Sequence, residues 1–168
     1  KGRGPVKPAE IEGTRIPGLL GLLRSYEDRT RYRVRRELAQ RETPDVLAAI
    51  ETFLKELPPE DPQRGHLQLE CLWVQQHHDA VTPPLLKQVL SSSEPRARAA
   101  AVTVLRHWLD RIPGSTDLLR AAANDPYPSV RMEAVVAASY VQSIAGVEIA
   151  LEAVKHSTDY YIDYALRE

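Results

Sequence analysis

Arginines are the first residues in this chain whose type and spacing suggest chemistry. Guanidinium groups bind phosphates and carboxylates, so a dense run of them raises the question of a nucleic-acid site. Five fall within eight residues: Arg29, Arg31, Arg33, Arg35 and Arg36. A helix turns by about 100° per residue, and the five side chains therefore cannot share one face of a helix.

The charge balance around this run is only mildly basic. From Ser25 to Glu42 the chain has six arginines and four acidic residues, and the whole protein has a net charge of -1. A protein that mainly binds phosphates usually carries a basic excess. We interpret the run as a solvated or ion-paired helix, with a phosphate-contacting patch and a surface for an acidic protein as alternatives. Nucleic acid is not an expected partner.

Histidines and the single cysteine are the residues that could bind a metal. His77 and His78 are adjacent and precede Asp79, but neighbouring helical side chains point about 100° apart and do not form the i, i+4 zinc clamp. We therefore predict a polar helix end. Cys71 lies in the apolar run "LQLECLWV", which predicts a small buried side chain. One cysteine allows no disulfide within the chain and no cysteine-based zinc site.

Catalytic motifs are missing from the sequence. It has no Gly-rich phosphate loop, no Ser-His-Asp motif and no HExxH, and no carboxylate pair stands out from the charged background. We assign no catalytic, cofactor-binding or metal residue and expect neither a cofactor nor a small-molecule ligand. No stretch approaches the roughly 18 apolar residues of a membrane span, so membrane insertion is not expected.

The elements that carry these residues repeat along the chain. Apolar residues recur at three- and four-residue spacing from Ile16 onward, which is the period of helices. Two columns recur in one register about every 33 residues, a period typical of solenoids. The acidic column is Glu27, Asp61, Glu94, Asp125 and Asp159, and the arginine column is Arg31, Arg64, Arg98 and Arg131.

Each repeat is predicted to be a pair of helices. The acidic residue suits the N-cap of the first helix, because its carboxylate accepts hydrogen bonds from free amides of the first turn. The second helices are expected to begin near Thr43, Thr82, Ser115 and Ala145. An arginine in the first turn could reach the acid of a neighbouring repeat. We predict a ladder of Glu27, Arg31, Asp61, Arg64, Glu94, Arg98, Asp125 and Arg131, best formed at Arg98 and Arg131.

Aromatic residues gather in "STDYYIDYALRE" (Ser157–Glu168), which predicts an aromatic, acidic helix. An apolar helix face at the edge of a repeat array is covered by the next repeat or by another domain. We predict Tyr160, Tyr161 and Tyr164 as a partner surface. Trp73 and Trp108 occupy similar places in successive repeats, and we expect both to pack between repeats.

The segment "DPYPSVRMEAVVAAS" (Asp125–Ser139) resembles the HEAT-repeat signature, in which an acid and a proline precede Val-Arg-x-x-Ala. The resemblance implies an all-α fold: a right-handed α-α superhelix, or HEAT/armadillo-like solenoid, of about four helix pairs and a truncated fifth. We predict a linker or extended arm over Lys1–Thr14 and a HEAT-like domain over residues 15–168. The chain begins without Met, and we expect it to be a fragment of a larger protein.

A second resemblance points to a parent protein. The segments "ECLWVQQHHDAV" (Glu70–Val81), "VRMEAVVAAS" and "STDYYIDYALRE" are similar to the middle helical region of large bacterial haem-binding, membrane-bound-dehydrogenase-like proteins. Members of that family have an N-terminal propeller resembling sorbosone or glucose dehydrogenases and a C-terminal cytochrome c domain with a CxxCH motif. The resemblance implies an exported, periplasmic protein, with redox activity in the flanking domains.

The sequence thus predicts a non-catalytic scaffold that positions neighbouring domains, its partners being flanking domains of the parent chain or another protein. Two other functions stay open at this point. One is a HEAT-like nucleic-acid-binding module, which needs a basic concave face. The other is a HEAT-like small-ligand enzyme of the bilin-lyase type, which needs a pocket lined by convergent polar side chains.

Overall fold

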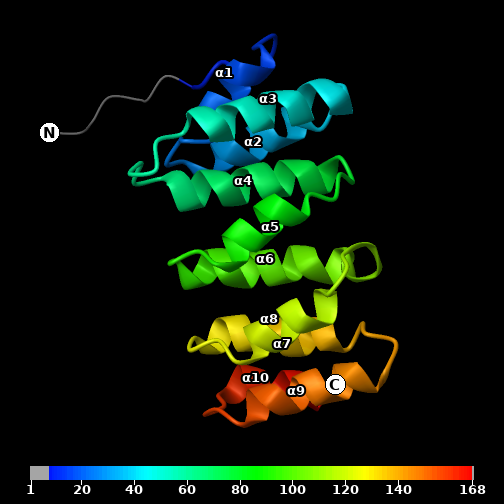
Figure 1. The fold of residues 1–168 in the computed structure, drawn as a ribbon. Helices are drawn as coiled ribbons and strands as arrows, with labels where there is room; N and C mark the ends of the chain where they lie inside the picture. Colours follow the sequence, from blue (N-terminus) through cyan, green and yellow to red (C-terminus); the bar gives the residue numbers. More distant parts are fainter. Residues whose placement is uncertain (1–7, 168) are drawn as a thin grey trace, which may run out of the picture. The chain divides into compact units, whose positions relative to one another are not determined.

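The computed structural model describes residues 8–167, which form helices and no strand (Figure 1). None of these helices has the length and apolar content needed to cross a bilayer. The helices are α1 (Ile16–Leu22), α2 (Asp28–Leu38), α3 (Thr43–Glu56), α4 (Arg64–His77), α5 (Pro83–Leu90), α6 (Pro95–His107), a 3-10 turn at Leu109–Arg111, α7 (Ser115–Ala123), α8 (Pro128–Ala138), α9 (Ile144–Val154) and α10 (Tyr160–Ala165).

The chain divides into two compact units, the first ending at His78 and the second beginning at Asp79. In the first unit, α1 packs on both α2 and α3, and α4 packs against the same two helices. Leucines dominate the interior because they recur at helical spacing on the facing sides of these elements. The buried side chains include Leu19, Leu23, Val34, Leu38, Ile50, Leu67 and Cys71.

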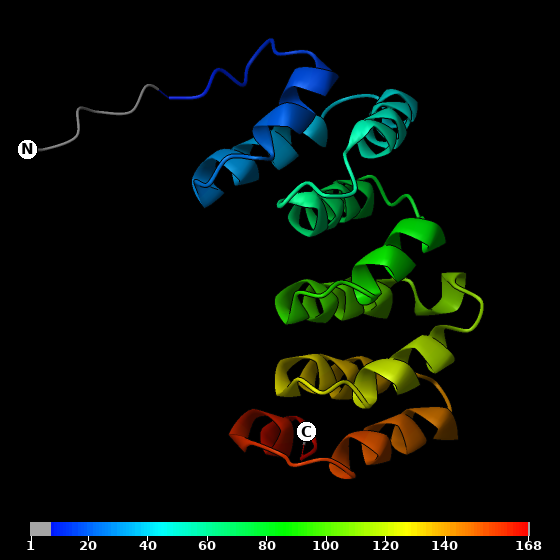
Figure 2. The same cartoon turned by 60° about the vertical axis from the view of Figure 1, so that its left-hand side comes forward.

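The second unit has two layers of helices (Figure 2). Helices α6, α8 and α10 form one layer, in which α8 packs against both of the others. Helices α5, α7 and α9 form the second layer, and α7 packs against α9. Alanines at buried positions of α6 and α8, such as Ala101 and Ala134, let the two helices approach closely. This layering places equivalent residues of successive repeats side by side.

Gly146 lies where the start of α9 meets the end of α8. A Cβ at this position would lie 2.6 Å from the carbonyl oxygen of Ala138 and 3.2 Å from that of Val141. The absence of a side chain at Gly146 therefore lets the start of α9 pack directly on the backbone at the end of α8.

Four acids of the acidic column accept hydrogen bonds from backbone amides near the start of a helix, in two different ways. Glu94 and Asp159 are the N-caps of α6 and α10, and their carboxylates accept from amides of the first turn. Asp61 and Asp125 lie two residues before the N-cap and accept from the amides of Gln63 and Tyr127 at 2.8 and 2.9 Å. These two acids thus close the turn that leads into the helix rather than capping the helix itself.

Glu27 differs from the other four acids. It occupies the N-cap position of α2, but its side chain makes no cap hydrogen bond. The carboxylate accepts from the hydroxyl of Thr30 at 2.8 Å. The second helices begin at Thr43, Pro83, Ser115 and Ile144, each within one residue of its predicted start.

The predicted fold class, all-α with paired repeat helices, is confirmed. Lys1–Lys7 of the predicted arm lie outside the described residues. Residues 8–15 precede α1 without forming a helix, and Ile11 within them is buried. The division into an arm and a repeat domain stays a prediction.

Candidate interaction surfaces

The column arginines share one contact in all four repeats. Each donates through Nη1 to two backbone carbonyls of the turn that precedes its helix. The acceptors are Ser25 and Tyr26 for Arg31, Leu57 and Pro58 for Arg64, Ser92 and Ser93 for Arg98, and Asp125 and Pro126 for Arg131. Carbonyls in a turn between two helices have no partner in the regular helical pattern, so a guanidinium at this place satisfies them.

Arg98 also makes the inter-repeat contact that the ladder predicts. Its Nε and Nη2 donate to the two carboxylate oxygens of Asp125 at 2.7 and 2.8 Å. Both side chains are about nine-tenths buried. The Tyr127 ring lies over the guanidinium, 5.3 Å from its central carbon. The hydrogen bond to Asp125 raises the pKa of Arg98, so this pair is fully charged at neutral pH.

The other column arginines do not reach the acids placed in the ladder. Arg31 donates from Nε to Glu70 at 3.0 Å, because Glu70 faces α2 from within α4 whereas Asp61 lies in the preceding turn. Asp61 accepts instead from Nη2 of Arg24 at 2.7 Å. Arg64 binds only backbone carbonyls among the described residues.

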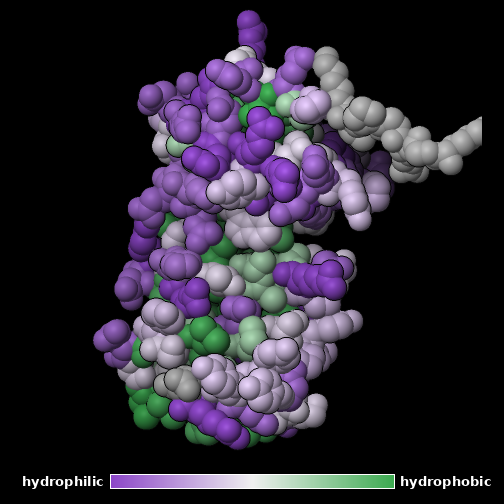
Figure 3. All heavy atoms as spheres, turned by 180° about the vertical axis from the view of Figure 1, so that it is seen from behind, coloured by the Kyte–Doolittle hydropathy of each residue, from purple (hydrophilic) through white to green (hydrophobic). Residues whose placement is uncertain are grey.

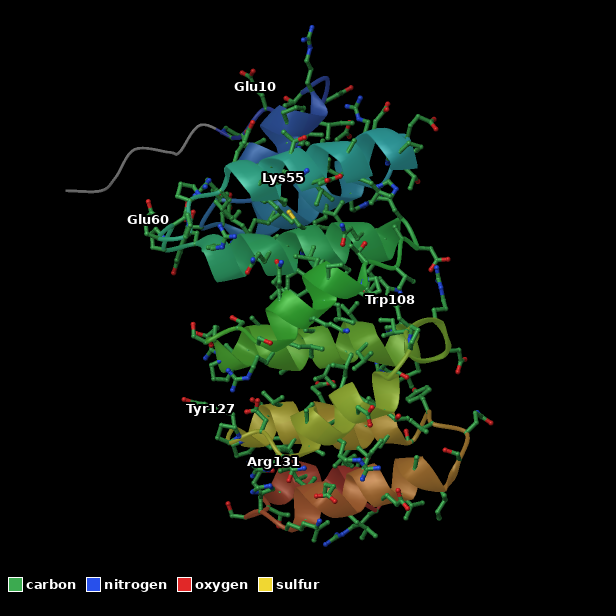
Figure 4. The ribbon with its side chains drawn as sticks, in the orientation of Figure 1. Glu10, Lys55, Glu60, Trp108, Tyr127 and Arg131 are labelled. Carbon is green, nitrogen blue, oxygen red and sulfur yellow. The ribbon has the colours of Figure 1, made fainter. Side chains whose placement is uncertain are left out.

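Arg131 is the most buried column arginine, with 2 % of its surface exposed. Its Nη2 donates to the carbonyl of Ser157 at 2.6 Å, and its Nε has no partner among residues 8–167. Arg131 and Tyr127 lie at the same end of the layer, whereas Trp108 lies at the opposite end (Figure 4). Asp159, the acid of the next repeat, accepts instead from the amides of Tyr161 and Ile162. Arg131 therefore joins successive repeats through carbonyls, not through a carboxylate.

The arginine run of α2 separates into two faces. Arg31 and Arg35 point toward α4, where both donate to the buried carboxylate of Glu70, at 3.0 and 2.5 Å. The Arg35 guanidinium also lies over the ring of Trp73 at 5.1 Å. Arg29, Arg33 and Arg36 are exposed. Because Glu70 is enclosed, its contacts hold α2 and α4 together through a buried ion cluster.

Glu70 is a structural residue that the repeat columns do not identify. It lies inside the apolar run "LQLECLWV", between Leu67 and Val74 on the face of α4 that is buried. An acidic residue at a buried helical position requires a basic partner. An acidic residue at a buried helical position, together with an arginine run one repeat earlier, is the sequence pattern that indicates this ion cluster.

An exposed apolar stripe runs along α9. Its members recur at three- and four-residue spacing and therefore share one face of the helix. They are Ile144, Val147, Leu151 and Val154, between 48 and 73 % exposed. Green, hydrophobic side chains gather at this end of the second unit in Figure 3. The opposite face of α9, with Gly146, Ile149 and Ala153, packs inside the unit.

The three predicted tyrosines lie on α10. Tyr160, Tyr161 and Tyr164 are 75, 66 and 57 % exposed, and the rings of the first two meet edge to face with centroids 5.5 Å apart. Ile162, which lies between Tyr161 and Tyr164 in the sequence, is fully buried and anchors the helix to the core. The tyrosines are thus held on a packed helix with their rings in solvent.

A hollow of about 260 Å³ lies beside the stripe. Val147 of the stripe lines it together with Val135 and Ala138 of α8 and with Ala165 and Leu166 at the end of α10. The lining is mostly apolar, so the hollow could receive an apolar side chain. We call the stripe, the three tyrosines and this hollow the α9–α10 face.

His78 holds helix ends together. Its Nε2 contacts the carbonyl oxygen of Leu38 at 3.1 Å and its Nδ1 contacts the hydroxyl of Thr43 at 2.9 Å. The His77 ring bonds back to the carbonyl of Trp73. Among residues 8–167, no group of His, Cys, Asp and Glu side chains could hold a metal ion.

Trp108 and Cys71 are both buried, in agreement with their predicted packing roles. Burial raises the pKa of the Cys71 thiol to about 12, and the neighbouring charge of Glu70 acts in the same direction. The thiolate is therefore absent at neutral pH, which makes Cys71 inert as a nucleophile.

The comparisons with known proteins agree with this geometry. No curated protein and no solved structure matched the chain. A family model for HEAT repeats matches residues 82–168, just over half of the chain. The matched residues contain the helix pairs in which Arg98 and Arg131 connect successive turns. The chain belongs to the HEAT-repeat family.

Proposed function

We propose that this chain is a non-catalytic scaffold that holds a neighbouring domain through the α9–α10 face. The observation that carries the proposal is the density of exposed apolar and aromatic side chains on two adjacent helices. Large exposed apolar patches rimmed by polar residues mark interaction sites. Tyrosine is enriched at such sites because its ring buries apolar area while its hydroxyl stays hydrogen-bonded.

Charges on α9 favour this assignment. Glu148 and Glu152 are drawn toward α7, where Arg120 lies 3.3 and 3.9 Å from their carboxylates. The polar side chains of α9 are thus used inside the unit, and the apolar stripe is left for a partner. A partner with a matching apolar helix face could insert one side chain into the hollow beside Val147.

Two aspartates in the native polypeptide test this role. Val147→Asp with Leu151→Asp places two charges in the stripe, and a bound domain should dissociate because burying unpaired carboxylates is costly. We expect limited proteolysis to release the neighbouring domain much faster from this variant than from the unsubstituted polypeptide. The matched control is Ala48→Asp with Thr52→Asp, which has the same spacing on an exposed part of α3. Equal release rates in both variants would contradict the proposal.

For the parent protein, we propose an exported, haem-containing, dehydrogenase-like polypeptide in which this module sets the distance between a propeller and a cytochrome c domain. This proposal rests on the sequence resemblance alone. Intact mass and a haem-stained denaturing gel of the native polypeptide test it. A large haem-positive chain would support it, and a haem-negative chain of about this size would refute it while leaving the scaffold role intact.

A further inference from the structure

Three arginines on the outer side of α2 form a stripe that has no acidic partner in the described part of the chain. Arg29, Arg33 and Arg36 are spaced by four and three residues, so they lie on one face of the helix. All three are exposed, and none makes an ion pair among residues 8–167. The helix rises by about 1.5 Å per residue, and the stripe therefore extends over roughly 10 Å.

The other arginines around α2 are engaged. Arg31 and Arg35 are held by Glu70, and Arg41 donates to Glu37 at 2.6 Å. The contacts with Glu70 fix the opposite face of α2 on α4. The exposed stripe is therefore presented by a helix whose orientation in the first unit is set by buried ion pairs, which reduces the ordering cost of binding.

An open hollow lies next to the stripe. It has a volume of about 470 Å³ and is lined by Ile11, Glu12, Tyr32, Arg33, Arg36, Glu37 and Gln40. Glu37 is paired with Arg41. Tyr32 is half exposed and Ile11 is buried, so the hollow offers some apolar contact next to Arg33 and Arg36. Hydrophilic side chains dominate the face of this unit in Figure 3.

We propose that the arginine stripe of α2 and the hollow beside it bind an acidic α-helix of a partner protein. Carboxylates with the same four- and three-residue spacing would pair with Arg29, Arg33 and Arg36, and the planar guanidinium can donate two parallel bonds to each. An apolar side chain of the partner would enter the hollow beside Tyr32. This surface lies in the first unit and is independent of the α9–α10 face, so its failure would leave the proposed function untouched.

Charge favours a protein partner over nucleic acid. The arginine stripe supplies three cations that are unpaired among the residues described. This is too few for strong binding to a phosphate backbone, whose affinity depends on neutralising many phosphates. Glu12 is exposed and lines the hollow, where it would repel a continuous run of phosphates. An acidic helix can place neutral residues opposite Glu12, and a phosphate backbone cannot.

Fluorescence anisotropy with a designed peptide tests the proposal. The probe is a labelled alanine-based helix with three glutamates at four- and three-residue spacing and one leucine beside them. Arg29→Glu, Arg33→Glu and Arg36→Glu together should weaken its binding at least about tenfold, since each exposed pair contributes modestly and reversal adds repulsion. The control is Arg15→Glu, Arg96→Glu and Arg167→Glu, which changes net charge equally at exposed positions and should alter affinity less than about twofold.

Three results would overturn the proposal. The first is no measurable binding of the peptide. The second is equal binding of a peptide with the same composition but with its glutamates spread around the helix. The third is tighter binding of duplex DNA or RNA that is lost in the same triple variant, which would assign the stripe to nucleic acid.

Discussion

Arg98 and Asp125 form a two-pronged ion pair that joins successive repeats of the second unit. Nε and Nη2 of Arg98 lie 2.7 and 2.8 Å from the two carboxylate oxygens of Asp125. The same arginine donates through Nη1 to the carbonyls of Ser92 and Ser93. One side chain thus connects the turn before α6 to the turn before α8, which explains how the spacing of repeats is fixed at this point.

Removing either partner should destabilise the second unit. Arg98→Ala and Asp125→Ala are each expected to lower the free energy of unfolding by about 3 kcal/mol, because each leaves a largely buried charge unpaired. The double variant should cost little more than either single variant. Urea unfolding followed by Trp108 fluorescence in a Trp73→Phe background measures this. Arg96→Ala is the exposed control, expected within about 0.5 kcal/mol of the parent. Fully additive losses would show that the pair is not coupled.

Acid should weaken the same contact. Burial alone would raise the pKa of Asp125, but bonds from Arg98 and the Tyr127 amide, with the charges of Arg98 and Arg131, lower it below its ordinary 3.8. The folded state therefore binds this proton less readily than the unfolded state. The stabilisation is complete above the ordinary pKa and is lost as pH falls through the lowered folded value.

Asp125→Asn isolates this effect. The free-energy gap between the parent and Asp125→Asn should be largest at neutral pH and should shrink below pH 3.8. The lowered pKa values of Asp61 and Glu152 reduce stability in acid in both proteins and cancel in the comparison. Urea titrations at neutral and acidic pH measure the gap. A gap that stays constant, or widens in acid, would contradict the role of this carboxylate.

Glu70 should matter more to the first unit than any exposed charge of α2. Glu70→Gln leaves Arg31 and Arg35 without their carboxylate and is expected to cost about 3 kcal/mol. Amide hydrogen exchange in α2 and α4 should accelerate together. Arg29→Gln is the control and should leave exchange unchanged, because Arg29 makes no ion pair among residues 8–167. Unchanged protection in Glu70→Gln would mean that apolar packing alone holds α2 on α4.

Much of this fold is predictable because the sequence shows both the helical spacing of apolar residues and the regular recurrence of the acidic and arginine columns. The columns led by Glu94 and Asp125 locate helix starts to within a few residues, since capping is local chemistry. Pair assignments are harder. Arg31 was expected to reach the acid at the start of the next repeat and instead binds Glu70, because which carboxylate faces an arginine depends on helix packing and not on spacing.

The exposed surfaces, too, were only partly predictable from the sequence. Tyr160, Tyr161 and Tyr164 were predicted as a partner surface from composition, and the structure places all three in solvent on α10. That they bind a partner stays a prediction. The stripe of α9 was not identified, because Val147 and Leu151 look like core residues in a sequence. Only the packing of Gly146 and Ile149 inside the unit shows that the other face is exposed.

The central claim is that the α9–α10 face is covered by a neighbouring domain in the native polypeptide. Hydroxyl-radical footprinting tests it directly, because all seven tyrosines are exposed in this structure and serve as internal references. Comparing the native polypeptide with the isolated chain, we predict slower modification of Tyr160, Tyr161 and Tyr164. The rates at Tyr26 and Tyr127 should be unchanged. Equal rates at all five tyrosines in both samples would contradict the claim.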